Sequence, residues 1–246
     1  MSKTEREPWI LTFLSIGACA GWLASYLGMI RKSFRDRTYA MALMPLCCNI
    51  AFEFVYLLNP PESANSLMVI ACWLALNVPV VVTAIRFAPS EWGHAPFVQR
   101  NLPWIFAVSI ISWMTAHLAL IAQLGPAAAV SWSAWFCLLF FSSGSLCQLV
   151  DRGSSRGTSL SIWFSRFMGT ALILPYEILR YKHGYPNVLW QSPLGWLGGA
   201  ALFVLEISYG ILLWKILQSE RTVKPLGREK VGLESNKQSE RSMAAR

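Results

Sequence analysis

The chain has few charged residues, and aspartate is the scarcest of them. Asp, Glu, Lys and Arg make up 14% of its 246 residues, against about 25% in a soluble domain. Aspartate occurs twice, as Asp36 and Asp151, which excludes both an Asp-rich magnesium–diphosphate motif and a D-x-D-D acid motif. The patterns G-x-x-x-x-G-K-[ST] and G-x-G-x-x-G are also absent, so the sequence excludes a P-loop and a Rossmann dinucleotide site.

Cysteine and histidine are too scattered to indicate a metal site. The six cysteines all lie in apolar runs and form no C-x-x-C, and no Cys/His group has metal-ligand spacing. We therefore expect no metal and no cofactor, and interpret the cysteines as small buried hydrophobic residues. His117, which falls in the middle of an apolar run, is expected to hydrogen-bond to a neighbour and not to act as a catalyst.

Long apolar runs fill most of the chain. Hydrophobic residues make up 54% of the sequence, and a helix needs about 20 mostly apolar residues to cross a bilayer. Seven runs approach or exceed that length: Trp9–Ile30, Tyr39–Leu58, Ser66–Ile85, Trp104–Leu124, Ala127–Val150, Ser159–Leu179 and Leu194–Leu217. Open strands would leave backbone groups unpaired in lipid. The sequence therefore predicts an all-α fold, a polytopic membrane bundle of seven transmembrane helices over residues 1–217.

The basic residues predict how this bundle is oriented. Thirteen Lys and Arg residues flank the runs on one side and four on the other, and the basic side normally faces the cytosol. The N-terminus is expected to be lumenal and the C-terminus cytosolic. Residues 218–246 are polar and lack aromatics, so we expect a disordered cytosolic tail that can touch anionic lipid. The net charge of +8 is explained by this topology, and we expect no nucleic-acid partner.

Besides His117, and Lys215 at the end of the last run, four acidic or basic residues fall inside the apolar runs, namely Glu53, Arg166, Glu177 and Glu206. A charged group in hydrocarbon is costly, and by default it indicates a functional site. Glu177 lies close to the end of its run, where its carboxyl group can reach water. Glu53 and Glu206 lie deeper and at comparable depth, and they are the candidate catalytic acids. Because burial disfavours the charged form of a carboxyl group, we expect both acids to be uncharged and to face each other across a common hollow.

Six residues that share a helical face with an acid, or that offer a ring deep in the bundle, are the candidate substrate-binding groups: Asn49, Tyr56, Trp132, Trp163, Arg166 and Tyr209. Asn49 and Tyr56 stand four residues before and three residues after Glu53, so the three side chains share one face of a helix. The ring faces of tryptophans such as Trp132 and Trp163 can stabilise a passing cation.

Two segments carry a resemblance to a known family. One reads GSLCQLVDRGSSRGTS from Gly144 to Ser159 and continues as IWFSRF from Ile162 to Phe167, and the other reads NIAFEFVY from Asn49 to Tyr56. Together they resemble the signature of the fungal integral-membrane terpene cyclases, small seven-helix proteins of meroterpenoid and indole-diterpene biosynthesis. The resemblance covers nearly the whole chain except the tail. The chain departs from the family pattern at Phe52, where Trp is expected, and at Glu206, where Asp is expected.

The resemblance implies a reaction and assigns the acids to it. A terpene cyclase of this kind protonates the terminal epoxide of a prenylated polyketide or indole, and the resulting carbocation closes rings along the polyene. The acidic pair of the family maps onto Glu53 and Glu206. The implied partners are a small-molecule epoxyprenyl substrate and membrane lipid, and the implied location is the endoplasmic reticulum, as a multi-pass membrane protein. A buried, protonated glutamate fits this chemistry because opening an epoxide needs a general acid.

Two other functions remain open at this point. A small transporter or channel could use Glu53 and Glu206 as a proton or cation relay, although the sequence has no internal repeat and few helices broken by Gly or Pro. A non-catalytic membrane scaffold would lose little except stability when both acids are replaced by glutamine. The sequence leaves the oligomeric state unknown.

Overall fold

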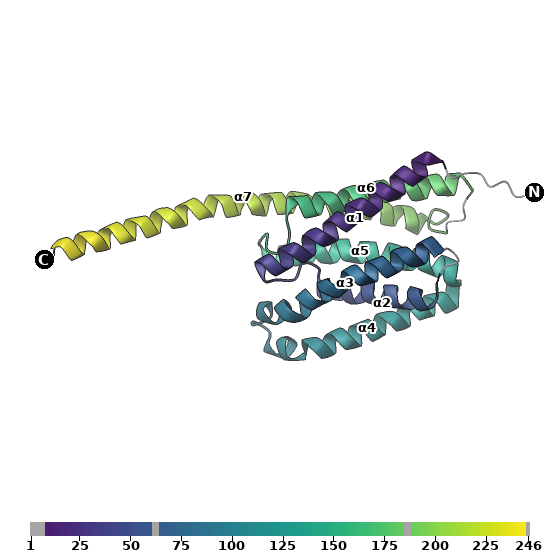
Figure 1. Ribbon diagram of the computed structural model, residues 1–246, viewed down its shortest axis with the longest axis horizontal. Helices are drawn as coiled ribbons and strands as arrows, with labels where there is room; N and C mark the ends of the chain where they lie inside the picture. The colour runs from purple at the N-terminus through teal and green to yellow at the C-terminus, as the bar shows by residue number, and fades with distance from the viewer. Residues whose placement is uncertain (1–7, 61–63, 185–187, 245–246) are drawn as a thin grey trace, which may run out of the picture.

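The computed structural model describes residues 8–60, 64–184 and 188–244, and within these residues every regular element is a helix (Figure 1). The helices, in chain order, are α1 (Trp9–Asp36), α2 (Leu43–Leu58), α3 (Ala64–Glu91), α4 (Pro96–Leu124), α5 (Pro126–Arg152), α6 (Leu160–Lys182) and α7 (Pro193–Ala244). Side chains are described to Thr222. The prediction of an all-α fold is confirmed for the described part of the chain.

Five of these helices are long and apolar enough to cross a membrane, namely α1, α3, α4, α5 and α7. Helix α2 has 16 residues, which is short of the roughly 20 needed to span the hydrocarbon core. Helix α6 carries Arg166 and Glu177 in its interior. An integral membrane bundle is therefore supported, while the count of seven spans stays a prediction.

The helices end at other residues than the predicted spans, because an apolar run marks only the part of a helix that lipid would cover. Helix α1 continues to Asp36 and α4 begins at Pro96, both in polar sequence. The second run was expected from Tyr39, but α2 begins at Leu43. Helix α7 extends from the bundle as one helix to Ala244 (Figure 1), where the sequence predicts a disordered tail. The Lys, Arg, Glu and Gln of this segment are good helix formers, and the domain boundary at residue 217 stays a prediction.

The helices close into a ring with α2 on one side of its interior. Helix α1 packs against α3 and α6, α4 packs against α3 and α5, and α7 completes the ring by contacting α5 and α6. Helix α2 contacts α3, α4 and α5 (Figure 1). Nine residues of α2 are buried, among them Glu53 and Tyr56. The shortest helix therefore carries a predicted acid into the protein interior.

Helices α1 and α6 approach closely because glycines face each other. A Cβ atom on Gly21 would lie 2.7 Å from the backbone oxygen of Ser165 and 2.8 Å from the nitrogen of Gly169. Small residues at such crossings let membrane helices pack backbone to backbone. This contact brings the Trp22 ring of α1 against Gly169 of α6, three residues after Arg166 in the chain, and so helps to position the interior described below.

Candidate functional site

Glu53 lies in a polar group inside the helix ring, which we call the Glu53 centre: Glu53, Asn49, Asn77 and Tyr26. The side-chain amide of Asn77 donates to Oε1 of Glu53 across 2.6 Å, and both residues are buried. The phenol of Tyr26 lies beside the amides of Asn77 and Asn49, and its ring stacks on Trp73 at 5.4 Å. One carboxyl oxygen of Glu53 is thus held by an amide in an aromatic surrounding.

Three helices supply the Glu53 centre and the two tryptophans near it, and each helix does so with two residues spaced four apart. Asn49 and Glu53 of α2, Trp73 and Asn77 of α3, and Trp22 and Tyr26 of α1 are pairs four residues apart, so each pair shares a helix face. The sequence interpretation did not single out Asn77. An asparagine inside an apolar helix also indicates a functional site, although less strongly than a charged residue does.

Glu206 lies in a second group, the Glu206 centre: Glu206, Arg166, Ser142, Trp163 and Tyr209. Arg166 Nε lies 3.0 Å from Oε1 of Glu206, and Arg166 Nη2 donates to Oε2 across 3.0 Å. Ser142 donates to Oε1 across 2.7 Å. The indole N–H of Trp163 donates to the backbone carbonyl of Glu206 across 2.8 Å, and the guanidinium of Arg166 stands 4.6 Å from the centre of the Tyr209 ring.

The ion pair corrects the expectation that both acids are uncharged. Glu206 is fully buried and Arg166 is 2% exposed, and a buried guanidinium beside a carboxyl group stabilises the carboxylate. The contacts of Glu206 are therefore those expected of a carboxylate, and the uncharged state remains expected for Glu53 alone. Arg166 also does not extend to the membrane surface, because its guanidinium is held inside by Glu206 and by the rings of Phe141 and Tyr209.

Aromatic rings connect the two centres. Trp22, one turn from Tyr26 on α1, meets Phe141 of α5 edge to face, with ring centres 5.7 Å apart. The guanidinium of Arg166 lies 5.0 Å from the centre of the same Phe141 ring. Rings in such positions can stabilise positive charge between the centres. A common hollow between Glu53 and Glu206 stays a prediction.

A third polar group lies beside α2, on the side of α4 and α5. The hydroxyl of Tyr56 pairs with the hydroxyl of Ser133 at 2.9 Å, and Nδ1 of His117 pairs with the Ser133 hydroxyl at 3.0 Å. Nε2 of His117 lies 3.9 Å from Sγ of Cys48, which lies 3.6 Å from Sγ of Cys137. The prediction that His117 hydrogen-bonds to a neighbour is confirmed.

The donor atoms of Cys48, His117 and Cys137 lie within 4.8 Å of one another. Two thiols and an imidazole are a donor set that zinc or copper(I) accepts. Sequence spacing could not indicate this group, because its members come from α2, α4 and α5. Hydrogen bonds already link the three side chains, and the prediction of no metal site stays a prediction.

The eight predicted site residues separate into several groups. Arg166, Trp163 and Tyr209 surround Glu206, and Asn49 accompanies Glu53. Tyr56 belongs to the third group with His117. Trp132 is half-buried and packs in a hydrophobic cluster with Trp135, Leu174 and Trp190, among others.

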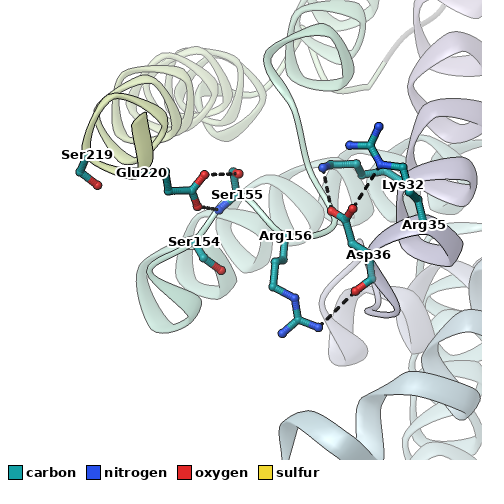
Figure 2. A pocket seen from close by; sticks show the side chains of 8 residues that line it. All are labelled: Lys32, Arg35, Asp36, Ser154, Ser155, Arg156, Ser219 and Glu220. Atoms are coloured by element: carbon teal, nitrogen blue, oxygen red, sulfur yellow. Dashed lines mark hydrogen bonds and ion pairs between the residues drawn. The ribbon is translucent and has the colours of Figure 1, made fainter. Parts of the chain in front are cut away.

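A pocket of about 740 Å³ opens at one end of the bundle, apart from both centres. The end of α1, the α5–α6 loop and α7 line it, with Asp36 between Lys32 and Arg35 on one side and Glu220 bound to Ser155 on the other (Figure 2). Its loop reads G-x-S-x-G from Gly153 to Gly157. A nucleophile elbow needs a strand before the serine, whereas helix α5 precedes this loop, so the pattern does not mark a hydrolase site.

The segment that carries the family resemblance builds this end of the bundle. Arg152 donates to Glu91 across 2.9 Å and to the backbone carbonyl of Tyr39 across 3.0 Å. The carboxylate of Asp36 accepts from the backbone amide of Gly157 across 3.0 Å. These contacts tie the α5–α6 loop to α3 and to the end of α1, so we expect Arg152 to have a structural role.

Replacing Arg152 by glutamine is expected to lower the melting temperature by about 5 °C and to leave the specific activity unchanged. The variant loses hydrogen bonds to a half-buried carboxylate, worth about 1.5–3 kcal/mol at most, and one kcal/mol corresponds to about 2–4 °C in a chain of this size. Arg35→Gln is the control, because the Arg35 side chain is 70% exposed. A loss of activity at an unchanged melting temperature would instead place Arg152 in the chemistry.

Comparison with known proteins gives consistent matches along the chain. The family described as Pyr4-like transmembrane terpene cyclases matches residues 3–219. Terpene cyclase dpmpB of Macrophomina phaseolina is 51% identical over 215 residues, which are 87% of this chain and 88% of that protein. Terpene cyclase janB of Penicillium janthinellum is 44% identical over 210 residues, 85% of this chain and 86% of its own length. Terpene cyclase pyr4 of Aspergillus fumigatus is 43% identical over 208 residues, 81% of this chain and 84% of its own.

Proposed function

This chain belongs to the Pyr4-like transmembrane terpene cyclases, and on that premise we propose that it protonates the terminal epoxide of a prenylated polyketide or indole and so starts a polyene cyclisation. The enzyme is an integral membrane protein with a small-molecule prenyl substrate. We further propose seven spans, a lumenal N-terminus, a cytosolic C-terminus and an endoplasmic-reticulum location, in keeping with the basic residues on one side of the bundle.

Glu53 is the proposed acid. Its protonated carboxyl group gives its proton to the epoxide oxygen, and the bond from that oxygen to the more substituted carbon breaks. The next double bond then attacks the cation. Each such attack forms a carbon–carbon bond and moves the positive charge along the prenyl chain. Loss of a proton ends the sequence. Substrate and product then have the same composition. The rings of Tyr26, Trp22 and Phe141, which contact other rings near Glu53 and Arg166, are proposed to stabilise the moving charge.

Glu206 is proposed to assist as a carboxylate. Its ion pair with Arg166 makes it a poor first proton donor, because a proton on Glu206 would leave the buried guanidinium unpaired. The pair fixes Arg166 between the rings of Phe141 and Tyr209, next to the proposed path of the cation. Asn49, Trp163, Arg166 and Tyr209 remain proposed substrate-contacting residues, and Tyr56 and Trp132 are proposed to shape the surrounding core.

One observation carries the proposal: a buried glutamate with one oxygen held by an amide and the other without a partner among the described residues, beside stacked aromatic rings. Opening an epoxide by general acid catalysis needs a protonated acid beside the epoxide oxygen. A carboxyl group that is shielded from water and has one open oxygen is suited to this role. The transport alternative has no comparable support, since the relatives are named terpene cyclases.

The direct test is a product assay in proteoliposomes with open-chain prenyl substrates that carry a terminal epoxide. The proposal predicts a product of unchanged mass that has fewer double bonds, additional rings and a new hydroxyl group, as determined by NMR. Heat-inactivated protein is the control. Recovery of unchanged substrate, or its movement across the bilayer without chemical change, would contradict a cyclase.

A further inference from the structure

Two neighbouring oxygen atoms in the Glu53 centre lack hydrogen-bond partners among the described residues. They are Oε2 of Glu53 and Oδ1 of Asn77, and both are shielded from solvent. The other atoms of the same two groups, Oε1 and Nδ2, bind each other across 2.6 Å. Buried polar groups in native proteins are nearly always paired, so two open oxygens on one hydrogen-bonded pair can bind a polar group, either a water molecule or an oxygen of the substrate.

The hydrogen bond between the side chains fixes what each open oxygen can do. Oε1 accepts from the amide N–H of Asn77, so in the neutral acid the proton sits on Oε2, which then acts as a donor. Oδ1 of Asn77 is a carbonyl oxygen and can only accept. The two side chains therefore present one donor and one acceptor that do not bind each other, in a surrounding where the Tyr26 and Trp73 rings are stacked.

An oxygen that is an epoxide before the reaction and a hydroxyl after it matches this pair at both stages. An epoxide oxygen accepts hydrogen bonds and donates none, so it is suited to Oε2–H of Glu53. The alcohol formed by ring opening has an O–H group that needs an acceptor, and Oδ1 of Asn77 offers one. The amide N–H meanwhile stays on Oε1 and stabilises the carboxylate that proton transfer leaves behind.

We propose that Asn77 is a further catalytic residue, which forms with Glu53 a two-point receptor for the epoxide oxygen of the prenyl substrate. In the step, the proton leaves Oε2, the bond between the epoxide oxygen and the more substituted carbon breaks, and the new hydroxyl donates to Oδ1. This inference rests on the proposed function, because it takes Glu53 as the acid. It adds a residue of α3 to the two proposed acids, which come from α2 and α7.

Asn77→Leu tests the proposal, because leucine has a similar shape and lacks both polar atoms. The expected result is a fall in kcat of about 100-fold, the size found when one donor to a developing charge is removed, with KM within about threefold of wild type. Proton transfer then becomes slower than the later steps, so the solvent deuterium isotope effect on kcat increases. Asn101→Leu, at the start of α4, is the matched control and keeps wild-type kinetics.

Asn77→Asp keeps the test decisive if the leucine variant does not fold. A protonated aspartate can donate to Oε1 and accept at its other oxygen, so activity is retained at low pH and falls as the pH rises, more steeply than in wild type. Because a new carboxyl group beside Glu53 alters the titration of Glu53 by itself, the pH profile is read together with the solvent isotope effect on kcat, which a purely structural role would leave at the wild-type value. Wild-type kcat and isotope effect in Asn77→Leu, or a wild-type pH profile in Asn77→Asp, would overturn the role of Asn77. If Glu53→Gln were inactive in that case, the proposed function itself would stand.

Discussion

Glu53→Gln is expected to lower the rate of cyclisation by about 10³-fold while the protein keeps its melting temperature within a few degrees. Glutamine has nearly the same shape and can still accept from Asn77 Nδ2 through its side-chain oxygen, but it has no acidic proton for an epoxide. General acid catalysis contributes about 10²–10⁴-fold to a rate. The measurement is single-turnover formation of the cyclic product in proteoliposomes.

Glu177→Gln is the control for this prediction, because Glu177 is also an acid of the apolar segments but lies near the end of α6. Its cyclisation rate should stay within about twofold of wild type. Cyclisation at the wild-type rate in Glu53→Gln would show that the proton comes from another group, and the assignment of the acid would then be wrong.

Arg166→Met is expected to be the most destabilising single change in the Glu206 centre. It leaves the carboxylate of Glu206 buried without its cation, and breaking a buried pair from one side costs about 3–5 kcal/mol. It also removes the cation from between the rings of Phe141 and Tyr209. We expect the melting temperature to fall by about 10 °C and the cyclisation rate to fall with it.

A double variant separates the loss of charge balance from the loss of function. Arg166→Met combined with Glu206→Met removes both charges, so it should recover much of the melting temperature that Arg166→Met loses. It should not recover cyclisation if the carboxylate assists the reaction. Arg86→Met, at an exposed position of α3, is the control for removing a cation. Full stability in Arg166→Met would contradict the ion pair described for Glu206.

The class of fold was predictable because lipid imposes it. Apolar length and the need to pair every backbone group leave helices as the simple solution for this chain, and each of the seven predicted runs corresponds to one helix of the described residues. Helix ends were less predictable, since polar residues such as Arg35 and Asp36 continue α1 beyond its apolar part. Hydropathy also contains no information on neighbours, so it did not show that α2 is surrounded by α3, α4 and α5.

The site was predictable one residue at a time, but its pairing was not. The cost of charge in hydrocarbon identified Glu53, Arg166 and Glu206 as unusual, yet only the packing of α6 against α7 shows that Arg166 belongs to Glu206. Asn77 was missed because a neutral amide is less unusual in an apolar helix. Phe52, one departure from the family pattern, contacts Tyr56 and His117, so its ring is not part of the Glu53 centre.

The two acids are assigned different charges, and this division of roles can be measured without substrate. Infrared difference spectra of the protein in lipid, wild type minus variant, separate the C=O stretch of a protonated carboxylic acid from the bands of a carboxylate. Glu53→Gln should remove the band of a protonated acid, and Glu206→Gln should remove carboxylate bands. If Glu53→Gln removed carboxylate bands instead, Glu53 would have no proton to give and could not start the reaction.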